Sequence, residues 1–156
     1  MAHPHRLLVV YHSRSGGTQA MTDAVVAGAT DDAIKGVHVI VQRAFDTGPD
    51  DVRSCNAIIL GTPSNFGYMS GALKDFFDRV FYEMVDDTPG LPYALYVKAS
   101  TDGDGAVRSV ERIVAGLRWK AIAPPLVVTG DLGPDELDQC HELGATMAAG
   151  LEAGMF

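Results

Sequence analysis

The chain has 156 residues, of which 47% are hydrophobic, and it carries a formal net charge of −8. This size and apolar content predict one folded domain spanning residues 1–156. The negative charge opposes binding to nucleic acids and to anionic membranes, and no apolar run approaches the ~20 residues needed to cross a bilayer.

Short apolar runs alternate with helix-period segments along the chain, which is the βαβ rhythm of an α/β protein. Strands are predicted at Leu7–Tyr11, Val37–Val41, Ala57–Leu60, Tyr93–Ala99 and Leu126–Thr129. Helices are predicted at Thr18–Gly28, Ser70–Met84, Gly105–Gly116 and Pro134–Gly150, with a short turn at Pro49–Ser54. In the second of these helices an aromatic stripe recurs at helical spacing, and we expect Phe76 and Phe77 to be core residues.

This order of elements favours a three-layer sandwich, a five-stranded parallel sheet in the order 2-1-3-4-5 with helices on both faces. In such a sheet the ligand crevice lies outside the carboxyl ends of the first and third strands. Turn-rich segments follow three strands at that edge, namely residues 13–18, 61–68 and 100–105. We therefore expect the functional site there.

The first of these segments is a hydroxyl- and glycine-rich loop that consists of Ser13, Arg14, Ser15, Gly16, Gly17 and Thr18. Glycines let the backbone approach a ligand, and the following helix N-terminus offers unpaired N–H donors. The loop has neither the Lys of a Walker loop nor the G-x-G-x-x-G pattern, so it suits one terminal phosphate, as in FMN, better than a pyrophosphate. The alternative is a plain βα turn with a Ser or Thr N-cap.

The loop resembles the phosphate loop of the flavodoxin-like superfamily. Residues 49–51 and the run 57–76 further resemble the branch that contains NAD(P)H:quinone oxidoreductases of the tryptophan-repressor-binding-protein type and NADPH-dependent FMN reductases. The similarity covers nearly the whole chain. It implies a flavodoxin-like fold, FMN as cofactor, and transfer of reducing equivalents from NAD(P)H to a quinone or similar acceptor.

By position, the resemblance also implies three groups of FMN contacts. The loop 13–18 would hold the phosphate. The isoalloxazine would be lined by Thr62, Pro63, Ser64, Asn65, Phe66 and Gly67, and the pyrimidine edge would meet Ser100, Thr101, Asp102 and Gly103. Because the flavin carries the hydride and electron chemistry, no side chain is predicted to be catalytic.

Other residues with reactive side chains are given structural roles. Cys55 and Cys140 match no metal-binding or C-x-x-C spacing, so we expect reduced, half-buried thiols. No metal site is predicted, because the acidic loop around Asp102 lacks the remaining ligands of an EF-hand. His12 is expected to be a solvated or packed residue at a strand end. Residues 1–6 lead into a strand-length apolar run and not into the core of a signal peptide. We therefore expect a cytoplasmic protein.

Several alternatives stay open. The only tryptophan, Trp119, lies outside all three loops, and Tyr68 either contacts the flavin or packs against the next helix. The chain is too short for the insertion with which the quinone reductases build a tetramer, while a homodimer remains open. Besides a reductase with small-molecule donor and acceptor, the chain could be an electron carrier whose acidic rim docks to redox partner proteins, or a module without usable flavin.

Overall fold

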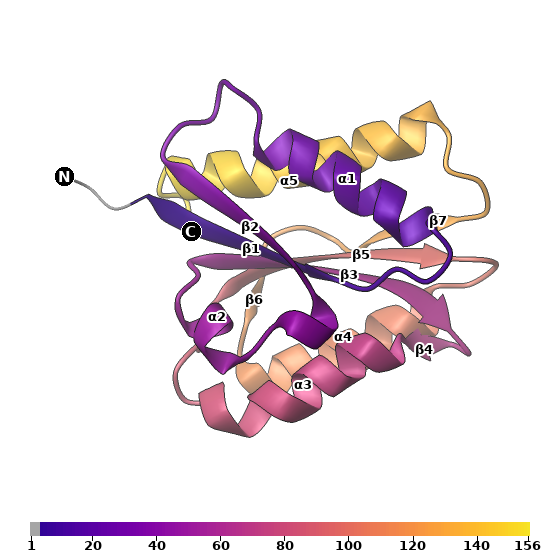
Figure 1. The fold of residues 1–156 in the computed structure, drawn as a ribbon, viewed down its shortest axis with the longest axis horizontal. Helices are drawn as coiled ribbons and strands as arrows, with labels where there is room; N and C mark the ends of the chain where they lie inside the picture. The colour runs from indigo at the N-terminus through magenta and orange to yellow at the C-terminus, as the bar shows by residue number, and fades with distance from the viewer. Residues whose placement is uncertain (1–3) are drawn as a thin grey trace.

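Helices cover both faces of one central sheet in a computed structural model that describes residues 4–156 (Figure 1). The strands are β1 (His5–Tyr11), β2 (Val37–Arg43), β3 (Ala57–Asn65), β4 (Tyr68–Met69), β5 (Pro92–Ala99), β6 (Lys120–Ala121) and β7 (Leu126–Thr129). The helices are α1 (Gly17–Ala29), α2 (Pro49–Arg53), α3 (Gly71–Met84), α4 (Asp104–Leu117) and α5 (Pro134–Glu152), with a 3-10 turn η1 (Ala44–Asp46). Residues 1–3 lie outside the described residues. They belong to the segment 1–6 on which the expectation of no signal peptide depended.

The sheet runs β2-β1-β3-β5-β6, and β7 also pairs with β5. Strand β6 pairs with the start of β5 and β7 with its end, so the two are pieces of one interrupted edge strand. Taken together as the fifth strand, they confirm the predicted order 2-1-3-4-5. The prediction missed β6, since Pro124 and Pro125 separate the pieces and proline has no N–H to donate to a ladder.

The third strand is longer than predicted. Strand β3 continues beyond Leu60 to Asn65, and it then turns back into the two-residue strand β4, with which it pairs antiparallel. The sequence predicted a turn at residues 61–68, because Gly, Pro, Ser and Asn are turn formers. Pairing of residues 58–63 with β5 overrides that local preference.

The core has two halves, one on each face of the sheet. Helices α1 and α5 cover one face, and α2, α3 and α4 cover the other (Figure 1). Successive residues of β1 alternate between the halves: Leu7 and Val9 face α1, while Leu8 and Val10 face α3. Helix α3 begins after Ser70, whose hydroxyl accepts a hydrogen bond from the amide of Leu73 at 3.2 Å.

The predicted core aromatics and thiols are buried. Phe76 and Phe77 are at most 1% exposed, which confirms their assignment to the core. Cys55 and Cys140 are buried more deeply than the half-buried state that we expected, at 8% and 0% exposed. Burial raises the pKa of the Cys55 thiol to about 12 and that of Cys140 to about 11, so neither is a thiolate near neutral pH. Within residues 4–156, no helix combines the length and apolar character that crossing a bilayer requires.

Helices α1 and α5 approach each other until their backbones touch. A Cβ atom on Gly28 would overlap the carbonyl oxygen of His141, and a Cβ on Gly144 would overlap that of Val25. Both obstacles are main-chain atoms, which cannot move aside as a flexible side chain can. Glycine at these two positions therefore sets the distance between the helices, and α1 in turn carries the loop at its N-terminus.

We expect Gly144→Ala to lower the free energy of unfolding by about 3 kcal/mol, since the added methyl group must push two helices apart in a packed core. Urea denaturation of the wild type and the variant measures the difference. Gly71→Ala is the matched control, because a Cβ there meets no atom within 4 Å, and it should leave stability unchanged or slightly raised. Equal effects of the two substitutions would contradict this account of the helix contact.

Candidate functional site

The loops after β1, β3 and β5 meet at one edge of the sheet (Figure 1). The Ser64 hydroxyl donates a hydrogen bond to the carbonyl oxygen of Asp102 at 3.4 Å, which links the second loop to the third. Gly105, in the first turn of α4, lies so close to Gly67 that a Cβ there would overlap the Gly67 carbonyl. The three predicted segments are thus brought together.

The first loop, residues 13–18, presents a row of backbone amides without partners. None of these six amides donates a hydrogen bond to another residue within the described part of the chain. The N-cap residue of α1 is Gly16, with φ of 95°, so the N-cap is not the Ser or Thr considered as an alternative. Successive free amides at a helix N-terminus form a concave anion-binding site.

One hydroxyl of this loop is already engaged. The Ser13 Oγ accepts a hydrogen bond from the amide of Gln19 at 3.0 Å, which ties the start of the loop to the first turn of α1. Arg14 and Ser15 are exposed, whereas Thr18 is buried at 2% exposed. The loop is consequently tied to the helix at both of its ends, while its middle residues, 14–16, are exposed.

Lys98, which no motif in the sequence singles out, joins the first loop to β5. Its Cγ lies 3.2 Å from the position that a Cβ on Gly17 would take, and its Nζ donates to the carbonyl oxygen of Ala99 at 3.2 Å. It forms no ion pair with any residue between 4 and 156. A lone cation in an otherwise apolar strand was the signal that could have identified it.

A buried hydrogen-bond chain supports the loop from below. The Thr22 hydroxyl donates to the carbonyl oxygen of Thr18 at 2.8 Å, so the Tyr96 hydroxyl, 2.6 Å from Thr22 Oγ1, must be the donor to it. Burial raises the pKa of the Tyr96 phenol, which keeps it protonated as this donor role requires. The Tyr96 ring lies against Gly61, where a side chain would overlap it.

The second loop is a tight hairpin between β3 and β4. Phe66 and Gly67 at its tip both have positive φ, 53° and 69°, as the central residues of a type I′ turn do. Phe66 is fully exposed at 104%, so its ring packs against no other part of the site. Pro63, Ser64 and Asn65 are partly buried and lead the chain out to this tip.

The Thr62 hydroxyl holds the hairpin in place. It donates to the carbonyl oxygen of Pro63 at 2.8 Å and accepts from the amide of Ser70 at 2.9 Å. The residue is fully buried. Its side chain thus anchors the hairpin to the start of α3, and its hydroxyl is not free to bind a ligand.

The third loop is built around an aspartate turn and a required glycine. The Asp102 carboxylate accepts a hydrogen bond from the amide of Asp104 at 2.8 Å, while Ser100 and Thr101 are exposed. A Cβ on Gly103 would meet the Val127 side chain at 2.5 Å. No three His, Cys, Asp or Glu side chains of residues 4–156 are grouped as metal ligands.

His12 lies at the rim of the first loop with an unsatisfied ring nitrogen. Its Nδ1 is buried and has no hydrogen-bond partner among the described residues. Burial, and to a lesser degree the charge of Arg14, lowers the pKa of the imidazole below its usual value. The ring meets Phe45 edge-on, 6.2 Å between centroids, so of the two expected states the packed one is present.

Trp119 and Tyr68, the two other candidate aromatics, differ in their surroundings. Trp119 is buried in the core, where its Nε1 donates to the Thr88 hydroxyl at 2.9 Å. Tyr68 is 42% exposed and lines a groove on the α4 side of the hairpin. It shares this groove with Lys74 in the first turn of α3, on which one of the two expected roles of Tyr68 depends.

Sequence comparison identifies relatives among flavoproteins. Residues 41–131 match the sequence model of the NADPH-dependent FMN reductase family. An NAD(P)H dehydrogenase (quinone) of Acidithiobacillus ferrooxidans is 33% identical over 94 residues, which cover 47% of this chain and 46% of that protein. A flavodoxin of Aquifex aeolicus is 29% identical over 85 residues, which cover 54% of this chain and 45% of that protein. The matches therefore span less than half of each relative.

Solved structures share the fold over almost the whole length. A flavodoxin from the domain Archaea superposes with a TM-score of 0.77 and 23% identity, over 95% of this chain and 99% of the other. The family match extends from the end of β2 to the residues after β7, more than half of the chain, and includes the second and third loops of the site. The chain has the flavodoxin-like fold and belongs to the NADPH-dependent FMN reductase family.

Proposed function

We propose that the protein binds FMN at the three loops and transfers reducing equivalents from NAD(P)H to a quinone or a similar small-molecule acceptor. The observation that carries the proposal is the row of six unpartnered amides at residues 13–18, held between α1 and Lys98. The family description supports NADPH as donor, and the quinone dehydrogenase relative supports the acceptor.

The residues present fit the phosphate end of FMN. The amides of the first loop and the hydroxyl of Ser15 are its donors, with Arg14 and Lys98 as countercharges in a chain that is otherwise acidic. The open space over Gly16, where a Cβ would meet no atom within 4 Å, leaves room for the phosphate oxygens.

The other two loops provide mainly backbone groups for the ring. Residues 62–67 are proposed to line the isoalloxazine, and residues 100–103 its pyrimidine edge. FMN supplies the hydride and electron chemistry when bound. The chain's own task is to hold the ring in place and to exclude water from one side, so we assign no catalytic side chain.

An electron carrier is the second candidate. Phe66 projects fully into solvent at the hairpin tip, next to the proposed ring site, and such an exposed aromatic on an acidic molecule is suited to docking with a redox partner protein. The flavodoxin relative supports this alternative. A homodimer in which one copy covers the other's flavin would favour the reductase instead.

The cytoplasmic location stays a prediction.

Mixing FMN-saturated protein with NADPH, and separately with NADH, under anaerobic conditions distinguishes the two candidates. We expect the absorbance of the bound flavin to bleach within seconds of adding NADPH, because a reductase accepts hydride directly from its donor. Adding a quinone should then restore the oxidised spectrum. Flavin that stays oxidised with both nucleotides would refute the reductase and favour the carrier.

Gly17→Asp should weaken FMN binding by about 100-fold, because it adds a carboxylate close to the proposed phosphate position. The fold should persist, since an acidic residue in the first turn of a helix is favourable. Gly17→Asn is the control of equal size without the charge. Isothermal titration with FMN measures the dissociation constants of both variants. Equal dissociation constants for the two variants would show that the FMN phosphate does not bind to this loop.

Lys98→Met should keep the aliphatic packing against Gly17 and lose the positive charge. We expect FMN affinity to fall by about tenfold, with a weaker dependence on salt concentration than in the wild type. Lys120→Met, which removes a charge at the interrupted edge strand, serves as the control. An unchanged dissociation constant for Lys98→Met would show that the ammonium group does not face the ligand.

A further inference from the structure

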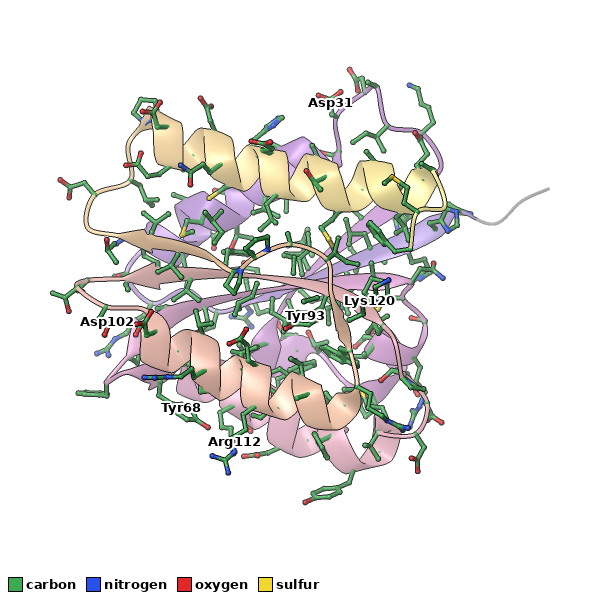
Figure 2. The ribbon with its side chains drawn as sticks, turned by 180° about the vertical axis from the view of Figure 1, so that it is seen from behind. Asp31, Tyr68, Tyr93, Asp102, Arg112 and Lys120 are labelled. Carbon is green, nitrogen blue, oxygen red and sulfur yellow. The ribbon has the colours of Figure 1, made fainter. Side chains whose placement is uncertain are left out.

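A second concave site lies on the other side of the β3–β4 hairpin. A groove of about 680 Å³ runs between the hairpin, the start of α3 and the outer face of α4. Tyr68, Lys74, Arg108 and Arg112 line it. Figure 2 shows Arg112 extending from α4 beside Tyr68, away from the sheet. Lys74, Arg108 and Arg112 lie outside the three loops, and Tyr68 directly follows residues 62–67, which are assigned to FMN.

The groove carries positive charge that the protein leaves unbalanced. Lys74 is paired with Asp78 at 2.6 Å, but neither Arg108 nor Arg112 forms an ion pair with any residue from 4 to 156. The two arginines are one helical turn apart, a spacing at which like charges destabilise a helix. Both guanidinium groups are exposed and line the groove with Lys74, so the lining is positively charged in a chain with 20 acidic and 12 basic residues.

The walls of the groove are fixed relative to each other. The amide of Met69 in β4 donates to the Ser109 hydroxyl in α4 at 3.1 Å, and that hydroxyl donates to the carbonyl oxygen of Ala106 at 2.7 Å. The hairpin also rests on Gly105, where no side chain fits. The ring of Tyr68, 42% exposed, is therefore held beside the arginines without being buried.

We propose that this groove binds the 2′-phosphoadenosine end of NADPH. Arg108 and Arg112 meet the 2′-phosphate, which a planar guanidinium group contacts through two parallel hydrogen bonds, and the Tyr68 ring lies against the adenine. The inference rests on the proposed function, for which it supplies the binding place of the electron donor.

The position of the groove suits one extended dinucleotide. The groove adjoins the proposed flavin site at the hairpin tip, because Gly67 lines the groove and also belongs to the segment 62–67 that is proposed to line the isoalloxazine. A molecule with the adenylate in the groove and the nicotinamide across the tip would reach the flavin ring. Because NADH has no 2′-phosphate, the arginines would select NADPH.

The direct test is binding of adenosine 2′,5′-bisphosphate to the FMN-saturated protein, measured by isothermal titration calorimetry. We expect Arg108→Gln with Arg112→Gln to weaken binding by about 100-fold, about tenfold for each lost contact to the phosphate. Arg112→Lys should retain part of the affinity. The control, Lys35→Gln with Lys120→Gln, removes the same charge at exposed positions that do not line the groove. Neither arginine side chain makes a hydrogen bond within the described chain, so melting temperatures should not change.

Two results would overturn the assignment. One is equal affinity for the bisphosphate in the arginine double variant and the lysine double variant. The other is binding of adenosine 5′-monophosphate as tight as that of the bisphosphate, since the 2′-phosphate would then have no contact.

Flavin reduction by NADPH separates this proposal from the proposed function. If NADPH reduces the wild type and the arginine double variant with the same KM, the reductase stands and the groove assignment is wrong. If NADPH reduces neither protein but the bisphosphate binds in an arginine-dependent way, the groove stands as a nucleotide site and the reductase is wrong.

Discussion

Parallel pairing of β1, β3 and β5 is the constraint on which the candidate site depends. All parallel strands of a sheet end at the same edge, so loops far apart in the sequence emerge side by side. The register places Tyr11 opposite Gly61 and Gly61 opposite Tyr96, so the three strands reach this edge together. A shift of one residue in either pair would turn the side chains of a whole strand to the other face.

The same register explains how the first loop is held. Gly61 has no side chain, and the Tyr96 ring occupies the space beside it. From there the phenol donates to Thr22, which donates in turn to the backbone of α1 at Thr18. Since these two hydrogen bonds are buried, water does not compete with them. The position of the loop amides is therefore determined by strand pairing in the sheet and not by the loop residues alone.

The chain carries a net negative charge, but positively charged groups gather at two places on the molecule. One is the first loop with its free amides and Lys98, and the other is the groove with Arg108 and Arg112. Amides keep their partial charge at every pH, so they bind a phosphate without titrating themselves. Between the two sites, the type I′ turn of the hairpin tip holds Phe66 at positive φ, a backbone conformation that is costly for a residue with a side chain.

The sequence by itself determined the fold class and pointed to the candidate site at one edge of the sheet. Apolar runs of strand length, helix periodicity and the loop between the first strand and helix are local patterns, and each of them has one dominant structural reading. The strand order and the convergence of the loops followed from general rules for parallel sheets. The family resemblance, confirmed by the comparisons, depended on the same residues.

Only the tertiary structure decided the extension of β3 to Asn65, the interruption of the edge strand, and the partners of individual side chains. It brought Lys98 to the first loop and engaged the Thr62 hydroxyl in holding the hairpin. It also left Arg108 and Arg112 without an ion pair to any residue between 4 and 156, although the chain is rich in carboxylates. These outcomes depend on contacts between distant segments, and local sequence preference carries no information about such contacts.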